Sequence, residues 1–473
     1  MNNFEENLIS RRAALKSLSS GFGYLAFAAM AHDLARAEGA GRVNPLAPKA
    51  PHFEPRAKRV IFLSMRGAPS HVDTFDYKPK LQADDGKAGL GGRLRGSRLL
   101  GSPWEFSQHG KSGLWVSELL PEIARHADDL CVLKGMNTDL PNHPQAQVQM
   151  HTGSFQFVRP SLGAWTLYGL GTENANLPGF VVLNPPNGTA QHFGSAFLPA
   201  IYQGAKFGGD QRGRGGFQRR GRGGRKPAIP NVANSKLNRD LQRIQLDFVQ
   251  SLNQSKLDRE VYQPEVEGAI ESFELAFRMQ DELPELMDIS GEPQETLDLY
   301  GIDGSETDRF GRQCLLARRF SEEGVRFIEL VHQNWDHHRN LSNDLPARCN
   351  EIDKPIAGLL ADLKRRDMLD DTLVIWAGEF GRTPHSQGSD GRDHNNKGYT
   401  TWMAGGGVKG GFQHGATDDY GYEAVDGKMH IHDWHATILH LLGLDHERLT
   451  FKHAGRDFRL TDVHGQVARE IIS

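Results

Sequence analysis

Short apolar runs rich in β-branched residues recur along this chain, and they constrain its fold more than any other feature. The runs at 59–65 (RVIFLSM) and 372–377 (TLVIWA) are almost continuously apolar rather than alternating, as in strands buried on both faces. Between such runs lie segments of helical period, among them 309–323, which Gly324 ends, and 355–368. We therefore expect a doubly wound α/β fold with a mostly parallel sheet and helices on both faces. The strands predicted in this way span 59–65, 130–136, 180–183, 325–332, 372–377 and 400–404.

The chain of 473 residues is expected to form one large domain with additions. Two segments inside that domain break the alternation of strands and helices. Residues 236–289 are polar with a helical period and predict a helical excursion beside the sheet, whereas 205–226 is an Arg- and Gly-rich insertion expected to be disordered. The expected parts are an export signal over 1–37, a Pro- and Ala-rich linker over 38–57, the α/β domain over 58–465 and a short tail over 466–473.

The first 37 residues have the order of parts found in an export signal. Residues 10–16 (SRRAALK) resemble a twin-arginine signal, a weakly apolar stretch follows over 18–31, and 35–37 (ARA) supplies a small-x-small cleavage site. The competing interpretation is a cytosolic amphipathic helix that contains an Arg-Arg pair. We expect export by the twin-arginine pathway to the periplasm or the cell exterior. No other segment approaches the roughly 18 apolar residues that a membrane helix requires.

The Arg/Gly-rich segment and the overall charge bear on partners. Segment 205–226 holds six Arg and two Lys but only one Asp, which is typical either of an RNA-binding arm or of a disordered loop. We favour the loop, because an exported protein rarely meets RNA; an acidic polysaccharide or the cell surface is a better-placed partner. A net charge of −4 gives no general attraction to nucleic acid or membranes, so no nucleic-acid partner is expected. The three Cys are too few for a disulfide framework.

Polar clusters follow the predicted strands in the last third of the chain. Asp336 and His338 come just after the strand at 325–332, and as alternate residues of an extended segment they would face one metal ion. Glu379, which follows the strand at 372–377, would supply another carboxylate, and Arg382 would fork onto the oxygens of a tetrahedral anion. A solvated loop and an internal ion pair are the competing interpretations of these two clusters.

Two further clusters supply imidazoles and one more carboxylate. Asp393 and His394 are adjacent in a loop, a pairing that commonly chelates metals, and Lys397 nearby would bind the charge of a substrate. His432 and His435 stand at the start of a predicted helix, where either would complete a metal shell. A structural role in the first helical turn is the alternative for this last cluster.

Polar residues also follow the first two predicted strands. Asp73 would reach a metal ion and Ser70 an anion, and His143 follows the second strand after a short loop. Because parallel strands present their carboxyl ends at one edge of the sheet, these residues and the later clusters are expected to meet there. Hard oxygen ligands and imidazoles converging from distant segments are what metal-dependent hydrolases of phosphate and sulfate esters need.

These residues resemble a bacterial family of twin-arginine-exported, sulfatase-like proteins of unassigned function, a domain of unknown function placed within the alkaline phosphatase superfamily. The resemblance extends over most of the chain from Arg59 to Gly465. Its motifs are GAPSHVDTFDYKP (67–79), RPSLGAW (159–165), GEFGRTP (378–384), AGGGVKGG (404–411), HATILHLLGLDH (435–446) and GRDFRLTDVHG (455–465).

The resemblance implies an α/β core with one or two divalent metal ions at the strand ends and a side-chain nucleophile that attacks phosphorus or sulfur. Two departures stand against a direct transfer of that mechanism. The superfamily places an Asp directly after the first strand, where this chain has Arg66. The register expected to hold a Ser or Thr nucleophile holds His143 instead, which leaves Ser70, Ser154 and Ser161 as other candidate nucleophiles. No formylglycine-forming C-x-P-S-R motif occurs either.

Two hypotheses of function follow. The first is an exported metal-dependent hydrolase of sulfate or phosphate esters, whose substrate is an anionic ester such as a sulfated or phosphorylated glycan. In it Arg382 and Lys397 hold the anion, and His143 acts as acid–base or as the attacking group. The second is a non-catalytic relative that keeps the fold and binds anionic glycans or cell-surface polymers. The sequence leaves open the metal (Zn, Ca, Mg or Mn) and the oligomeric state.

Overall fold

The computed structural model describes residues 44–89, 97–186, 188–208, 237–257 and 264–473. The predicted export signal, the first part of the predicted linker and residues 209–226 of the Arg/Gly-rich segment lie outside these ranges. Residues 205–207, which were expected to belong to the disordered insertion, form a short strand instead. Among the described residues, no helix combines the length and the apolar character that crossing a membrane requires.

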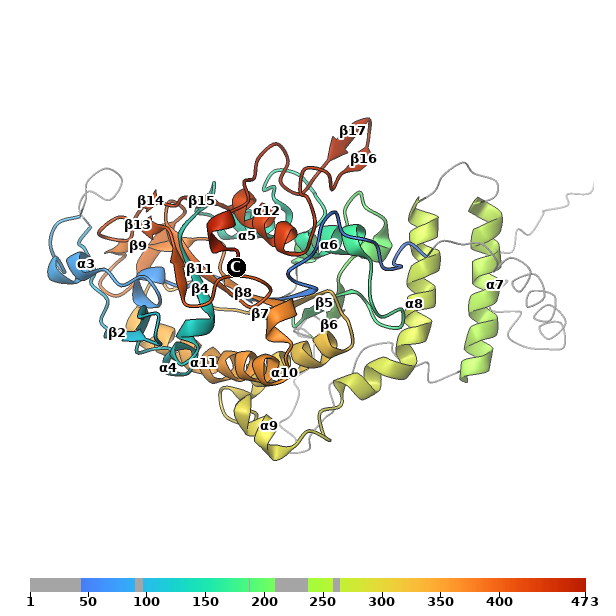
Figure 1. The fold of residues 1–473 in the computed structure, drawn as a ribbon, viewed down its shortest axis with the longest axis horizontal. Coiled ribbons are helices and arrows are strands. Elements are labelled where there is room, and N and C mark those ends of the chain that lie inside the picture. The colour runs from blue at the N-terminus through green and yellow to red at the C-terminus, as the bar shows by residue number, and fades with distance from the viewer. Residues whose placement is uncertain (1–43, 90–96, 187, 209–236, 258–263) are drawn as a thin grey trace, which may run out of the picture.

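A mixed, mostly parallel sheet of nine strands forms the centre of the molecule (Figure 1). The central strand, Arg59–Met65, pairs in parallel with a neighbour on each side. Its apolar side chains are covered on both faces, as is typical of parallel sheets. Only β11 runs antiparallel to its two neighbours. The order is β12 (Phe412–His414), β4 (Leu130–Asn137), β11 (Tyr399–Ala404), β8 (Thr372–Ala377), β1 (Arg59–Met65), β7 (Phe327–His332), β5 (Phe180–Leu183) and β6 (Ala205–Phe207), with β15 (Met429–His430) beside β4.

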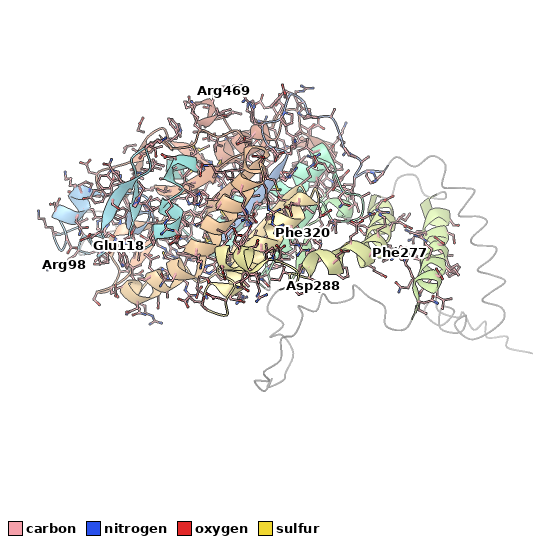
Figure 2. The ribbon with its side chains drawn as sticks, turned by 60° about the horizontal axis from the view of Figure 1, so that its bottom comes forward. Arg98, Glu118, Phe277, Asp288, Phe320 and Arg469 are labelled. Atoms are coloured by element: carbon pink, nitrogen blue, oxygen red, sulfur yellow. The ribbon has the colours of Figure 1, made fainter. Side chains whose placement is uncertain are left out.

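Helices cover both faces of this sheet, which confirms the predicted fold class. Alternate side chains of β1 enter different cores: Ile61 and Leu63 lie in one, Val60 and Phe62 in the other. The first core is closed by α10 (Asp308–Glu322) and α11 (Leu341–Arg365), which lie side by side in Figure 2. The second is closed by α5 (His143–Thr152), α6 (Leu162–Leu170) and α12 (Ile431–Leu441) on the opposite side of the sheet in Figure 1.

Helix α11 begins at Leu341, well before the start predicted at 355. Two internal prolines, Pro346 and Pro355, made the first half look non-helical, because proline removes a backbone donor and crowds the preceding turn. The helix continues through them because its apolar face is buried in the first core, including Leu345 and Ile352. Burial of that face outweighs the local cost.

The predicted helical excursion contains α7 (Arg239–Leu257) and α8 (Pro264–Met287), which stand to one side of the sheet in Figure 1. They contact each other through Arg239 and Arg243, whose guanidinium carbons lie 4.7 and 5.1 Å from the ring centroid of Phe277, labelled in Figure 2. The smaller elements include α3 (Pro79–Ala83), α4 (Pro121–Ala124), α9 (Gln294–Leu299) and the paired strands β2 (Phe106–His109) with β3 (Leu114–Ser117), β9 (Gly381–Ser386) with β10 (Arg392–Asn395), β13 (Ala416–Thr417) with β14 (Ala424–Asp426), and β16 (Phe451–His453) with β17 (Arg456–Phe458).

The sheet topology explains where the polar clusters meet. Strands β1, β7 and β8 are parallel, and β4 shares their direction because β11 runs antiparallel to both β8 and β4. Their carboxyl ends therefore lie at one edge of the sheet, where ligand sites of α/β folds form. The segment that carries Asp336 and His338 follows β7, Glu379 follows β8, and α5 follows β4.

Candidate metal centre

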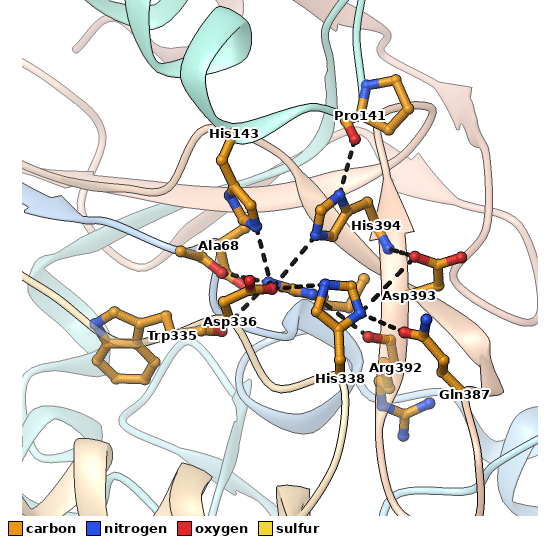
Figure 3. Close-up of polar contacts among 12 residues, drawn as sticks. Ala68, Pro141, His143, Trp335, Asp336, His338, Gln387, Arg392, Asp393 and His394 are labelled. Carbon is orange, nitrogen blue, oxygen red and sulfur yellow. Dashed lines mark hydrogen bonds and ion pairs between the residues drawn. The ribbon is translucent and has the colours of Figure 1, made fainter.

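Three imidazoles and the guanidinium of Arg382, from three segments of the chain, surround a single oxygen atom, Oδ1 of Asp336 (Figure 3). The Nε2 atoms of the three imidazoles lie 3.1 Å (His143), 2.9 Å (His338) and 3.3 Å (His394) from it. Arg382 Nη2 donates a hydrogen bond to the same oxygen at 2.6 Å. His143 is the first residue of α5, while His394 and Arg382 are paired across the β9–β10 hairpin.

Each of the three imidazoles is held from behind by its Nδ1 atom. His143 Nδ1 lies 2.5 Å from Glu379 Oε1, His394 Nδ1 lies 2.8 Å from the carbonyl oxygen of Pro141, and His338 Nδ1 contacts Gln387 Oε1. All three partners are acceptors, so each Nδ1 atom carries the hydrogen. Metal-binding imidazoles are oriented in this way by a carboxylate or carbonyl behind the ring.

The inward-facing nitrogens then require a positive partner. With Nδ1 protonated, each neutral ring points the lone pair of Nε2 at the Asp336 carboxylate, and two acceptors repel each other unless a proton or a cation lies between them. His143 Nε2 is buried, and despite its 3.1 Å approach to Asp336 it makes no hydrogen bond with a described residue. One ligand atom from each of His143, Asp336, His338 and His394 lies within 4.8 Å of all the others. This donor set fits a divalent ion.

Electrostatics at the centre favour the ionised carboxylate. Burial raises the pKa of Asp336, but its close contacts with the imidazoles of His143 and His394 and the charge of Arg382 outweigh burial and hold that pKa well below its usual range. Burial lowers the pKa of His143, but the carboxylates of Asp336 and Glu379 outweigh burial and raise it. The Asp336 side chain is 41% exposed, so the centre opens to solvent.

Glu379, expected to be a ligand, lies behind His143 rather than among the four converging residues. Its carboxylate is fully buried and accepts hydrogen bonds from Gly67 N at 3.1 Å and Gln147 Nε2 at 2.9 Å, besides its contact with His143. Burial raises the pKa of Glu379, but the hydrogen bond and charge of His143 outweigh it and lower that pKa. Glu379 therefore orients the His143 ring and keeps a negative charge behind it.

Arg382, expected to hold a substrate anion, is committed within the protein. Its side chain is buried, Nε donates to the carbonyl oxygen of Ala68 at 3.0 Å, and Nη2 donates to Asp336 and to the carbonyl oxygen of Gly67. This fork positions Asp336 and offsets its charge.

Asp73 and Ser70, expected at the metal and the anion, belong to a separate buried ion pair. Both Asp73 oxygens accept from Arg392, at 2.6 and 2.9 Å, and both side chains are fully buried. The Ser70 hydroxyl donates to Asp73 Oδ2 at 2.5 Å. Of the other candidate nucleophiles, Ser161 caps α6 and Ser154 accepts a hydrogen bond from the backbone of Phe157.

The remaining predicted residues lie at the rim or elsewhere. Asp393 is exposed, with Oδ1 at 3.9 Å from His338 Nδ1, and the exposed Lys397 places Nζ 5.2 Å from the ring centroid of Tyr422. His432 and His435 are buried on α12, where their Nε2 atoms contact the carbonyl oxygens of Gly153 (2.9 Å) and Met150 (2.7 Å). Burial lowers the pKa of His435 to about 3.

Three groups that hold Glu379 or the imidazoles in place were not identified from the sequence. Gln147 could have been predicted, because it lies four residues after His143 on the same helix face. No sequence pattern marks Gln387 or the carbonyl of Pro141, because a loop amide and a backbone carbonyl acquire this role only when the loop folds against a histidine.

A family model described as "Protein of unknown function (DUF1501)" matches residues 57–472. A search of curated proteins found no match. Similar solved structures include the PsFucS1 sulfatase from Pseudoalteromonas sp. (13% identity, 90% of this chain and 73% of that chain, TM-score 0.35) and the lipoteichoic acid synthase LtaP from Listeria monocytogenes (10%, 91% and 80%, 0.37). Another is alkaline phosphatase from the Antarctic bacterium TAB5 (12%, 83% and 99%, 0.30).

Proposed function

The chain belongs to the DUF1501 family of proteins of unknown function, and we propose that it is an exported, metal-dependent hydrolase of sulfate or phosphate esters. The observation that carries this proposal is the convergence of three imidazole Nε2 atoms on one Asp336 oxygen, each ring held by an acceptor at Nδ1. Three imidazoles and one carboxylate suit zinc or a similar transition ion better than calcium or magnesium, which prefer oxygen ligands.

The ligands would be His143, Asp336, His338 and His394. When bound, a divalent ion supplies Lewis-acid polarisation of a phosphoryl or sulfuryl oxygen. The chain prepares the site for it: Glu379 holds the proton of His143 on Nδ1, and Arg382 fixes the Asp336 carboxylate. The partial exposure of Asp336 leaves one side of the centre open to an ester.

We infer that water attacks the ester directly. No Ser, Thr or Cys is found among the described residues that hydrogen bond or pair with the side chains of the four ligands, and Ser70 is buried against Asp73. His143 is unavailable as a free attacking group in this proposal because Nδ1 is engaged with Glu379 and Nε2 faces the other ligands.

Metal analysis of the purified protein, followed by a panel of nitrophenyl phosphate and sulfate esters, tests this function. We expect one transition-metal ion per chain, hydrolysis of at least one ester, loss of that activity on chelation and its return when zinc is added. A metal-loaded protein that turns over no ester would favour the alternative, a non-catalytic protein that binds anionic glycans.

Export by the twin-arginine pathway is a separate part of the proposal and rests on the sequence of residues 10–37. Replacing Arg11 and Arg12 together by Lys, in a bacterium with that pathway, should leave the protein in the cytoplasm, whereas the unchanged chain should appear in the periplasm. Equal export of both chains would contradict this route.

A further inference from the structure

A polar cavity of about 470 Å³, separate from the metal centre, lies beside the start of α12. Its volume is within the range of small-molecule sites, roughly 300–1,000 Å³. Its lining is polar apart from the exposed Val463, and includes Asp139, His430, His432, His464 and Gln466. None of these residues belongs to the metal centre.

His432 lines this cavity and has an unused acceptor. The side chain is only 7% exposed, and its Nε2 atom lies 2.9 Å from the carbonyl oxygen of Gly153, so Nε2 carries the hydrogen. The Nδ1 atom is then a lone-pair acceptor, and it is buried without a hydrogen-bond partner among the residues that the structure describes. A buried polar atom left without a partner costs free energy, so this position favours a ligand that donates a hydrogen bond.

The carboxylates around the cavity decide the charge of that ligand. The hydrogen bond from His430 is the largest of the effects that lower the pKa of Asp139 to about 2, so Asp139 is ionised. Asp433 is occupied, because it accepts from the backbone nitrogens of His430 (2.9 Å) and Gln466 (2.7 Å). Negative charge at the cavity disfavours a sulfate or phosphate group there.

The imidazoles are not gathered for a metal ion. The rings of His432 and His464 lie nearly parallel, with centroids 5.1 Å apart and planes 26° apart, so their in-plane lone pairs do not converge on one point. Within the described ranges, the only set of three or more ligand atoms close enough for an ion is the one at Asp336. Hydroxyl groups, which donate to imidazole nitrogens and carboxylates, are the chemistry that fits.

One short turn separates this cavity from the metal centre. On one side Asp139 faces the cavity, and on the other the carbonyl oxygen of Pro141 accepts from His394 Nδ1. Asn396 ties the turn down by donating to the carbonyl oxygens of Thr138 (2.8 Å) and Asp139 (3.0 Å). Four residues lead from Asp139 to His143, and an extended chain spans at most about 14 Å over that length. An oligosaccharide can bridge such a distance.

We propose that this cavity binds a neutral sugar residue of a glycan whose esterified residue lies at the metal centre. The placement of an esterified residue of the same glycan at the metal centre rests on the proposed function, whereas sugar binding in the cavity does not. Sugar hydroxyls donate to His432 Nδ1 and to Asp139, and the carboxylates exclude a second charged unit. The cavity is thus a specificity site, and the substrate is an oligosaccharide ester rather than a small aryl ester.

Binding of neutral sugars tests the cavity without any hydrolysis. We would titrate the metal-loaded protein with cellohexaose, mannohexaose and agarohexaose by calorimetry, and compare the variants His432→Phe and Asp139→Asn. At least one hexasaccharide should bind the unchanged protein, and both variants should weaken that binding tenfold or more. His453→Phe, which alters an exposed histidine on β16, should leave binding unchanged. Metal content serves as the check that each variant is folded.

The outcomes separate this inference from the proposed function. Neutral-sugar binding without turnover of any ester would support the cavity as a sugar site and contradict the proposed hydrolase activity. Hydrolysis of nitrophenyl esters with no binding of any of the three sugars would overturn the cavity proposal. A second metal ion per chain that His432→Phe removes would also overturn it. If a sulfated or phosphorylated oligosaccharide is hydrolysed, Asp139→Asn should raise KM for it and leave KM for the nitrophenyl ester unchanged.

Discussion

Glu379 Oε1 lies 2.5 Å from Nδ1 of His143, although 236 positions separate the two residues in the chain. The contact joins the segment just after β8 to the first residue of α5 across the edge of the sheet. A carboxylate behind a ligating imidazole selects the Nδ1–H tautomer and raises the basicity of Nε2. The geometry therefore assigns Glu379 a supporting role, and this role can be measured.

Replacing Glu379 by Gln should weaken metal binding by roughly 10–100-fold, the usual effect of losing a group behind a ligand. Competition with a chromophoric chelator measures the change. Glu329→Gln is the matched control, because Glu329 is another buried carboxylate paired with a histidine, His151, at 2.9 Å. Equal losses in the two variants would show that Glu379 acts through general stability alone.

Asp336→Asn should remove the metal more completely than any change behind the ligands, because the amide carries no charge. Arg382 keeps the carbonyl oxygens of Gly67 and Ala68 as partners, so the loop is expected to stay folded. Asp393→Asn changes an exposed carboxylate beside the centre and should retain the ion. Metal content after gel filtration distinguishes the two, and an Asp336→Asn protein that keeps its ion would remove Asp336 from the ligand set.

Asp73→Asn should destabilise the fold by about 3–5 kcal/mol, because it leaves the buried guanidinium of Arg392 without its charge partner. The midpoint of denaturant unfolding measures this loss. Asp308→Asn, which removes a surface pair with Arg312, should change the midpoint little. Metal content of the folded Asp73→Asn protein should remain normal, and its loss would place Asp73 at the centre after all.

His151 makes stability depend on pH. Burial lowers its pKa, but the charge and hydrogen bond of Glu329 outweigh burial and raise it above the ordinary value of 6.5. A raised folded-state pKa means that the imidazolium stabilises the fold fully below about pH 6.5 and that this contribution is lost as pH rises through the folded-state value. The stability cost of His151→Gln should thus be larger at about pH 5.5 than at about pH 9. A cost that is equal at both values, measured by denaturant unfolding, would contradict the charged pair.

The strands were predictable because their signal is local. The runs at 59–65 and 372–377 are strands with those same bounds, since an apolar β-branched run buried on both faces leaves little choice of structure. Helix α11 shows the limit: its prolines obscured the first half, which is helical because of an apolar face buried in the first core. Local preference gave way to burial there.

The sequence by itself determined which strand ends carry acids and imidazoles, and so at which edge of the sheet a site would form. Asp73, Asp336 and Glu379 all follow such strands, yet they have three different partners: Arg392, the imidazole cluster and the back of His143. Only the tertiary structure decided among them. The role of a carboxylate depends on which group approaches it within about 3 Å, and the packing of segments from different parts of the chain sets that distance.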